Sequence, residues 1–259
     1  MNLPIYQVDA FTNERFKGNP AAVCPLTEWL EEQTMQKIAA ENNLSETAFY
    51  VKNDDTYEIR WFTPTGEVDL CGHATLATAF VLFTFYETDL SKVTFHSKSG
   101  PLHVTKEDER LTLTFPSRVG ERCVAPEALI KGLGKAPKEV YAARDYMAVF
   151  DSEDDINQLQ LDMNELKKLD QFAVIVTAKG NDVDFVSRFF APKAGVDEDP
   201  VTGSAHCTLI PYWSKTLKKD TLVAKQISTR GGTLYCENLG DVVKISGEAV
   251  LYLKGEITF

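Results

Sequence analysis

Two segments of the chain place a titratable side chain close to a glycine that begins an apolar run. The first contains Gly72 and His73, and the second contains Asp199, Gly203 and Ser204. A glycine at the start of a helix lets a ligand approach the backbone closely. The N–H groups at that end, together with the helix dipole, favour an anion. We therefore expect the two helix starts together to cradle one small carboxylate, with His73 and Asp199 beside it as proton donors and acceptors.

Glu46 is a third candidate, because it lies between the end of a predicted helix and the start of an apolar strand. Partial burial of a carboxylate at such a place raises its pKa and suits it to proton transfer. Each of the three candidates also has a purely structural explanation. Glu46 would then be a solvated glutamate at a helix end, Asp199 part of a capped turn, and His73 a histidine with satisfied hydrogen bonds.

Other kinds of site find less support in the residue patterns. The pairs Cys71 with His73 and His206 with Cys207 are spaced unlike any common zinc ligand set, so no metal is expected. Neither a glycine-rich dinucleotide fingerprint nor a Walker loop occurs, so no nucleotide cofactor is expected. Ser204 opens a helix and does not stand in a nucleophile elbow.

The chain contains an internal repeat. Phe62 corresponds to Phe190 at an offset of 128, and Gly72 corresponds to Gly203 at an offset of 131. The segment 97–102 then matches 229–234 at an offset of 132. Ordered matches with little drift indicate a duplicated α/β unit. We expect an N-terminal half of residues 1–117, with the last strand at about 249–259 as an optional addition, and a C-terminal half of residues 118–259, linked near 116–126.

Hydrophobic periodicity supplies the elements that position these residues. Helices are predicted over 27–42, with Thr27 as the N-cap, over 74–86 and over about 205–214. Strands are predicted over 5–11, 47–52, 57–63, 93–95, 102–105, 111–115, 173–177 and 183–190, and further strands close the chain up to Phe259. The helix over 74–86 is apolar nearly all round, so a sheet must enclose it. Residues 150–170 are interpreted as a peripheral helix and loop.

The composition of the chain limits the classes of partner that the protein is expected to bind. The 259 residues carry a formal net charge of −11, which disfavours nucleic acid and anionic membranes. No signal peptide or bilayer-spanning stretch is expected. The five cysteines are scattered, as is typical of a reducing cytoplasm.

The same segments resemble the signatures of the phenazine-biosynthesis PhzF-like family. The matching stretches are 8–12 with 16–23, 43–49, 62–64 with 67–77, and 198–207 with 211–213. The resemblance implies a mixed α/β fold of the diaminopimelate-epimerase-like kind, with two pseudo-symmetric halves, each a curved sheet around a buried helix. It implies a site between the halves, no cofactor and a homodimer.

The resemblance also assigns roles. It implies that Glu46 is the acid/base, that His73 and Asp199 assist, and that Gly72, Gly203 and Ser204 bind the substrate carboxylate. The expected activity is a proton-shift isomerisation of a small carboxylic acid, like that of trans-2,3-dihydro-3-hydroxyanthranilate. Two alternatives stay open. One is a two-thiol epimerase or racemase of the same fold, and the other is a non-catalytic ligand-binding protein.

Overall fold

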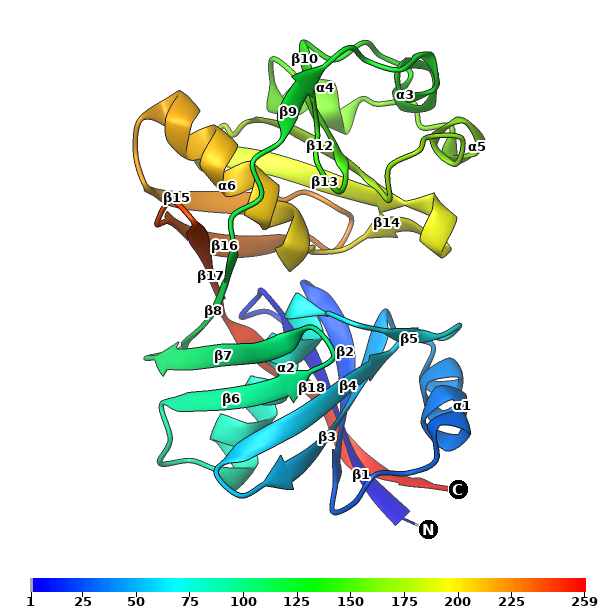
Figure 1. The fold of residues 1–259 in the computed structure, drawn as a ribbon, viewed down its shortest axis with the longest axis vertical. Coiled ribbons are helices and arrows are strands. Elements are labelled where there is room, and N and C mark those ends of the chain that lie inside the picture. The colour runs from blue at the N-terminus through cyan, green and yellow to red at the C-terminus, as the bar shows by residue number, and fades with distance from the viewer. Residues whose placement is uncertain (1) are drawn as a thin grey trace. The chain divides into compact units, whose positions relative to one another are not determined.

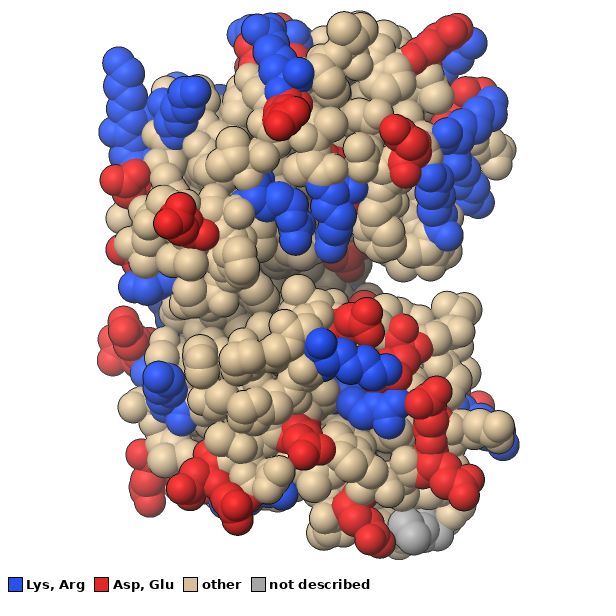
Figure 2. Space-filling view, viewed as in Figure 1, with Lys and Arg blue, Asp and Glu red and all other residues tan. Residues whose placement is uncertain are grey.

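The computed structural model describes residues 2–259, and the chain divides into two compact units. Unit 1 comprises Met1–Thr114 with Ser246–Phe259, and unit 2 comprises Phe115–Ile245. Strands account for more of the chain than helices, and the predicted mixed α/β class is confirmed (Figure 1). Acidic and basic side chains are interspersed over the face of the molecule shown in Figure 2.

Unit 1 is a mixed sheet beside one buried helix. Its elements are β1 (Asn2–Ala10), β2 (Asn19–Leu26), α1 (Glu32–Asn42), β3 (Glu46–Asn53), β4 (Thr56–Phe62), β5 (Glu67–Val68), α2 (Gly72–Val81), η1 (Leu82–Tyr86), β6 (Lys92–Ser97), β7 (Gly100–Glu107), β8 (Arg110–Pro116) and β18 (Ala249–Thr258). The strands pair in the order β18-β1-β2-β3-β4-β6-β7-β8. Helix α2 contacts β1, β2 and β3, and Leu76 at its centre is fully buried.

Unit 2 has a second helix enclosed in the same way. Its elements are β9 (Glu121–Cys123), α3 (Glu127–Leu133), β10 (Glu139–Ala142), β11 (Tyr146–Val149), α4 (Glu153–Asn157), α5 (Met163–Leu166), β12 (Val174–Lys179), β13 (Phe185–Ala191), η2 (Pro192–Ala194), β14 (Val196–Asp199), α6 (Gly203–Leu217), β15 (Thr221–Gln226), β16 (Gly232–Asn238) and β17 (Val242–Gly247). Phe185 stacks on Trp213 of α6 at a centroid distance of 5.6 Å, and the Trp213 indole donates to Thr177.

The internal repeat reappears in the strand pairing. In unit 1, β2 and β3 are parallel, β3 and β4 antiparallel, and β4 is parallel to β6, with α2 between β4 and β6 in the chain. In unit 2, β11 and β12 are parallel, β12 and β13 antiparallel, and β13 is parallel to β15, with α6 between the last two. A parallel neighbour needs a crossover connection, and each unit uses its central helix for this purpose.

Several predicted boundaries were wrong. Helix α1 begins at Glu32, because residues 27–31 are irregular and the Trp29 indole donates to Glu58 on β4. This tertiary contact outweighs the capping signal at Thr27. Strand β1 ends at Ala10, since Phe11 adopts a positive φ of 63°.

The central helices also differ from their predicted ranges. Helix α2 ends at Val81 and continues as the π-helix η1, in which Tyr86 hydrogen-bonds Tyr6 and Phe85 stacks on that ring at 5.0 Å. Residues 150–170 are not merely peripheral, because Ile156 and Leu166 are buried in the core of unit 2. Among residues 2–259, no helix is both long enough and apolar enough to cross a bilayer.

Candidate active site

Glu46 and His73 meet at the start of α2. Glu46 is the first residue of β3, and the parallel register with β2 sets it opposite Ala21. Three residues earlier, Asn43 ends α1 in the left-handed conformation, with φ of 49°, and so turns the chain toward β3. The second residue of α2 is His73, and its Nε2 lies 3.1 Å from Glu46 Oε2.

These two facing atoms have unused bonding capacity. Glu46 Oε2 and His73 Nε2 are both buried, and neither makes an aligned hydrogen bond within residues 2–259. Buried polar atoms are normally satisfied, so an unsatisfied pair that shares one space indicates a place for a third partner. The side chain of Glu46 as a whole keeps 18% of its surface exposed, although Oε2 itself is buried.

The other edge of the imidazole is held by buried groups. His73 Nδ1 lies 3.3 Å from Asn19 Nδ2 and 3.5 Å from Cys71 Sγ. Burial alone would lower the pKa of His73, but the Cys71 sulfur and the Glu46 carboxylate outweigh it and hold that pKa well above its ordinary value. A raised pKa favours the protonated imidazole, which can stabilise negative charge near Glu46.

Cys71 is set up as a neutral thiol. It occupies the N-cap of α2 and is buried. Burial, with a smaller contribution from Glu46, raises the pKa of the Cys71 thiol to about 11. At neutral pH the reactive thiolate is therefore scarce. Glu46, Cys71 and His73 bring three ligand atoms within 4.8 Å of one another, a donor set that could hold a metal ion despite the unusual spacing in the sequence.

Asp199, Gly203 and Ser204 come together in unit 2 at the start of α6. The Asp199 carboxylate accepts a hydrogen bond from the Thr202 hydroxyl. The buried side chain of Gln226 donates to Asp199 O at 2.7 Å and accepts from Thr202 N at 2.9 Å. These bonds fix the turn between β14 and α6. Thr202 does not cap the helix with its side chain, so the first turn of α6 can present N–H groups to an anion.

An arginine that the sequence did not single out lies at this helix start. Arg144 Nη2 donates to Ser204 Oγ at 3.2 Å, while Nε and Nη2 bind the carboxylate of Asp145. Asp145 is 1% exposed and holds the guanidinium in place. The cation adds to the field at the α6 N-terminus. Arg144 lies in a stretch that matches no recognised signature, so only structure could reveal its role.

Known proteins resemble this chain over nearly its whole length. The family model "Phenazine biosynthesis-like protein" (PhzC-PhzF) matches residues 8–255. A Pseudomonas aeruginosa protein named as an uncharacterized isomerase is 50% identical over 257 residues, covering 99% of each chain. A crystal structure of a PhzF-family phenazine biosynthesis protein from Enterococcus faecalis has a TM-score of 0.98 at 52% identity, covering 100% of each chain.

A more distant structure shares the fold. The hydroxyproline epimerase of Agrobacterium vitis has a TM-score of 0.67 at 10% identity, covering 99% of this chain and 92% of that one. The resemblance noted in the sequence is confirmed by the family match, which spans nearly the whole chain. This chain belongs to the PhzC-PhzF family of phenazine biosynthesis-like proteins.

Proposed function

We propose that this protein is an isomerase that shifts a proton on a small carboxylic acid, with Glu46 as the acid/base and no cofactor. The observation that carries the proposal is the approach of Glu46 Oε2 and His73 Nε2 to 3.1 Å, with neither atom satisfied by an aligned hydrogen bond. The isomerase names of close relatives support the reaction class.

The proposed step balances without an oxidant or reductant. Glu46 takes a proton from a carbon next to a conjugated system, and the C–H electron pair enters that system. The proton on Glu46 exchanges with solvent, and Glu46 then delivers a proton to another carbon, so the molecular formula is unchanged. The imidazolium of His73 stabilises the negative charge that develops on the substrate.

The helix starts supply the carboxylate contacts in this proposal. Gly72 in unit 1 and Gly203 and Ser204 in unit 2 hold carboxylate oxygens through backbone N–H groups, and Asp199 assists proton exchange. A panel of cyclic and unsaturated carboxylic acids that includes trans-2,3-dihydro-3-hydroxyanthranilate, followed by NMR, tests the proposal. Isomerisation of a panel member supports it. Ligand-induced thermal shifts without any turnover favour a binding protein.

A thiol-blocking reagent separates this mechanism from a two-thiol racemase. We expect activity to stay above about half after treatment with methyl methanethiosulfonate, because burial keeps the Cys71 thiol protonated. The start of α6 carries Thr202, Gly203 and Ser204, and its nearest thiol, Cys207, lies a turn further along the helix. Loss of activity in step with labelling of Cys71, measured by peptide mass spectrometry, contradicts the glutamate mechanism.

Removal of the Ser204 hydroxyl tests the anion contact at α6. We expect Ser204→Ala to raise KM about fivefold and leave kcat within about threefold, as for the loss of one hydrogen bond in ground-state binding. Asp145 keeps its bonds to Arg144 in this variant, so thermal stability is unchanged. A variant with wild-type KM would show that Ser204 does not contact the substrate.

A further inference from the structure

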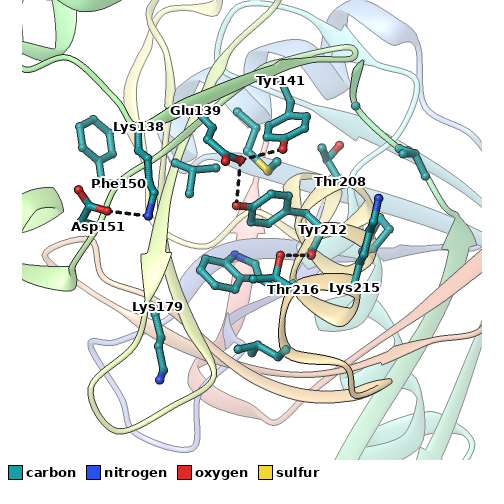
Figure 3. Close-up of a pocket in the computed structure, with 17 residues that line it drawn as sticks. Lys138, Glu139, Tyr141, Phe150, Asp151, Lys179, Thr208, Tyr212, Lys215 and Thr216 are labelled. Carbon is teal, nitrogen blue, oxygen red and sulfur yellow. Dashed lines mark hydrogen bonds and ion pairs between the residues drawn. The ribbon is translucent and has the colours of Figure 1, made fainter. Parts of the chain in front are cut away.

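Unit 2 contains a cavity of about 680 Å³ alongside α6 (Figure 3). It is lined by α6 from Thr208 to Leu217, by residues 119–120, by β10 and β11, and by the end of β12. The volume falls in the range of small-molecule sites. Asp199, Gly203 and Ser204 do not line it, so it is separate from the proposed carboxylate contacts of this unit.

A proline in α6 explains how one wall forms. Pro211 lies inside the helix and has no N–H to donate to the carbonyl of Cys207. The backbone N–H of Arg118 makes that bond instead, at 2.9 Å. This contact draws the following residues, Val119 and Gly120, alongside the helix. A Cβ at Gly120 would lie 3.1 Å from Tyr141, so glycine permits the close approach.

Aromatic rings line the walls, and the hydroxyl groups of two of them converge on one carboxylate. Tyr212 contacts Tyr141 at a centroid distance of 5.3 Å and Trp213 at 5.2 Å, both edge to face. The Tyr141 hydroxyl donates to Glu139 Oε2 at 2.8 Å, and the Tyr212 hydroxyl donates to the same atom at 3.5 Å (Figure 3). Rings held in this way can present a face or an edge to a planar ligand.

A buried hydroxyl in the lining has no partner. Thr208 is 2% exposed, and its Oγ1 makes no hydrogen bond within the described residues 2–259. Buried hydroxyls are normally satisfied, so this one calls for a polar atom that occupies the cavity. A ligand with a hydrogen-bonding group beside its ring meets that need.

The charges of the lining select an anion. Lys138 is paired with Asp151 at 2.9 Å, and Glu139 already accepts from two tyrosines and lies 3.8 Å from Arg122. Lys179 and Lys215 also line the cavity, and neither has an ion pair within residues 2–259. The acidic groups are thus engaged, while two ammonium groups are available to a ligand.

We propose that this cavity binds a planar aromatic acid. Its ring lies against Tyr141 and Tyr212, its polar substituent reaches Thr208, and its carboxylate or phosphate is held by Lys215 or Lys179. Such a ligand satisfies the unpaired hydroxyl and one of the two unpaired ammonium groups together.

A series of ligands with one ring and different charges tests the proposal by isothermal titration calorimetry. The probes are 2-naphthoate, the neutral 2-naphthamide and the cationic 2-naphthylmethylammonium. We expect saturable binding of 2-naphthoate and binding of the other two at least about fivefold weaker. Amide chemical-shift changes should fall on residues 139–142 and 208–217.

Matched variants give the second arm of the test. We expect the double variant Lys179→Gln with Lys215→Gln to bind 2-naphthoate about tenfold more weakly. The control, Lys167→Gln with Lys225→Gln, removes the same charge from exposed positions outside the cavity and should change affinity less than about twofold. Thr208→Val should weaken binding without lowering thermal stability, because it removes an unpaired hydroxyl.

Four results would overturn the proposal. They are no saturable binding up to about 5 mM naphthoate, tighter binding of the cation, equal affinity in the two double variants, and shift changes confined to the starts of α2 and α6. The last result would place the carboxylate at the proposed catalytic residues and leave the cavity without a ligand.

Discussion

Replacement of Glu46 by glutamine is expected to lower the rate of isomerisation by roughly a thousandfold, the usual scale for loss of a general acid/base. The amide has the shape of the carboxyl group but cannot take a proton from carbon. The substitution also removes a negative charge that raises the pKa of His73, so a smaller fraction of the imidazole is protonated. Both effects act on the same developing charge.

Two further substitutions make this result specific. Glu46→Asp keeps the carboxylate but draws it back from His73, so we expect intermediate activity. The control Glu109→Gln lies in an exposed turn between β7 and β8 and should retain wild-type turnover. The measurement is product formation by NMR at saturating substrate. A Glu46→Gln enzyme within about fivefold of wild type would remove Glu46 from the acid/base role.

Acidification is expected to weaken the fold through His206, by about 2 to 3 kcal/mol between pH 7 and pH 4.5. The His206 ring is fully buried in α6, and its Nε2 has no hydrogen-bond partner within residues 2–259. Burial lowers the pKa of His206 to about 4, although its Nδ1 hydrogen bond to Thr202 O opposes the shift.

The direction of this change in the free energy of unfolding follows from how many protons each state binds. Between about pH 4 and 6.5 the unfolded chain binds a proton at His206 that the folded chain does not. The free energy of unfolding therefore falls as the pH drops through that window. His73 acts in the opposite sense, since its folded-state pKa is raised: its stabilisation is complete below the unfolded pKa and is lost as pH rises through the folded value.

Urea unfolding of wild type and His206→Asn at several pH values isolates the His206 contribution. The asparagine amide can donate to Thr202 O in place of Nδ1 but does not titrate. We expect the variant to lose less stability on acidification than wild type, whatever its stability at pH 7. Equal pH dependence in the two proteins would show that His206 is not held neutral by the fold.

The sequence predicted the parts of the site that depend on local pattern. Gly72 and Gly203 do begin the two central helices, and Glu46 does begin a strand. A glycine before an apolar run and a polar residue between a helix and a strand are local signals, so one sequence is enough to detect them. Periodicity also identified strands in which buried and exposed residues alternate, such as β7 and β8, but it missed β2, which is buried on both faces.

Contacts between distant segments were not predictable in the same way. Asn19 is the first residue of β2, a strand that was not predicted. It reaches His73 because β2 pairs with β1. Arg144 reaches Ser204 across 60 positions, and Trp29 holds residues 27–31 out of a helix through Glu58. Each depends on side chains that meet only after the sheet has formed, so tertiary structure outweighs the local preference.

The most direct test of the central claim is deuterium incorporation during turnover. Wild type and Glu46→Gln would be incubated in D₂O with a substrate from the panel, with and without a metal chelator, and the product read by NMR. The account predicts deuterium at one newly protonated carbon in the wild-type product, no effect of the chelator and no incorporation with Glu46→Gln. Equal deuterium incorporation by both proteins would contradict proton transfer by Glu46. Loss of incorporation by wild type in the presence of the chelator would contradict a mechanism without a cofactor.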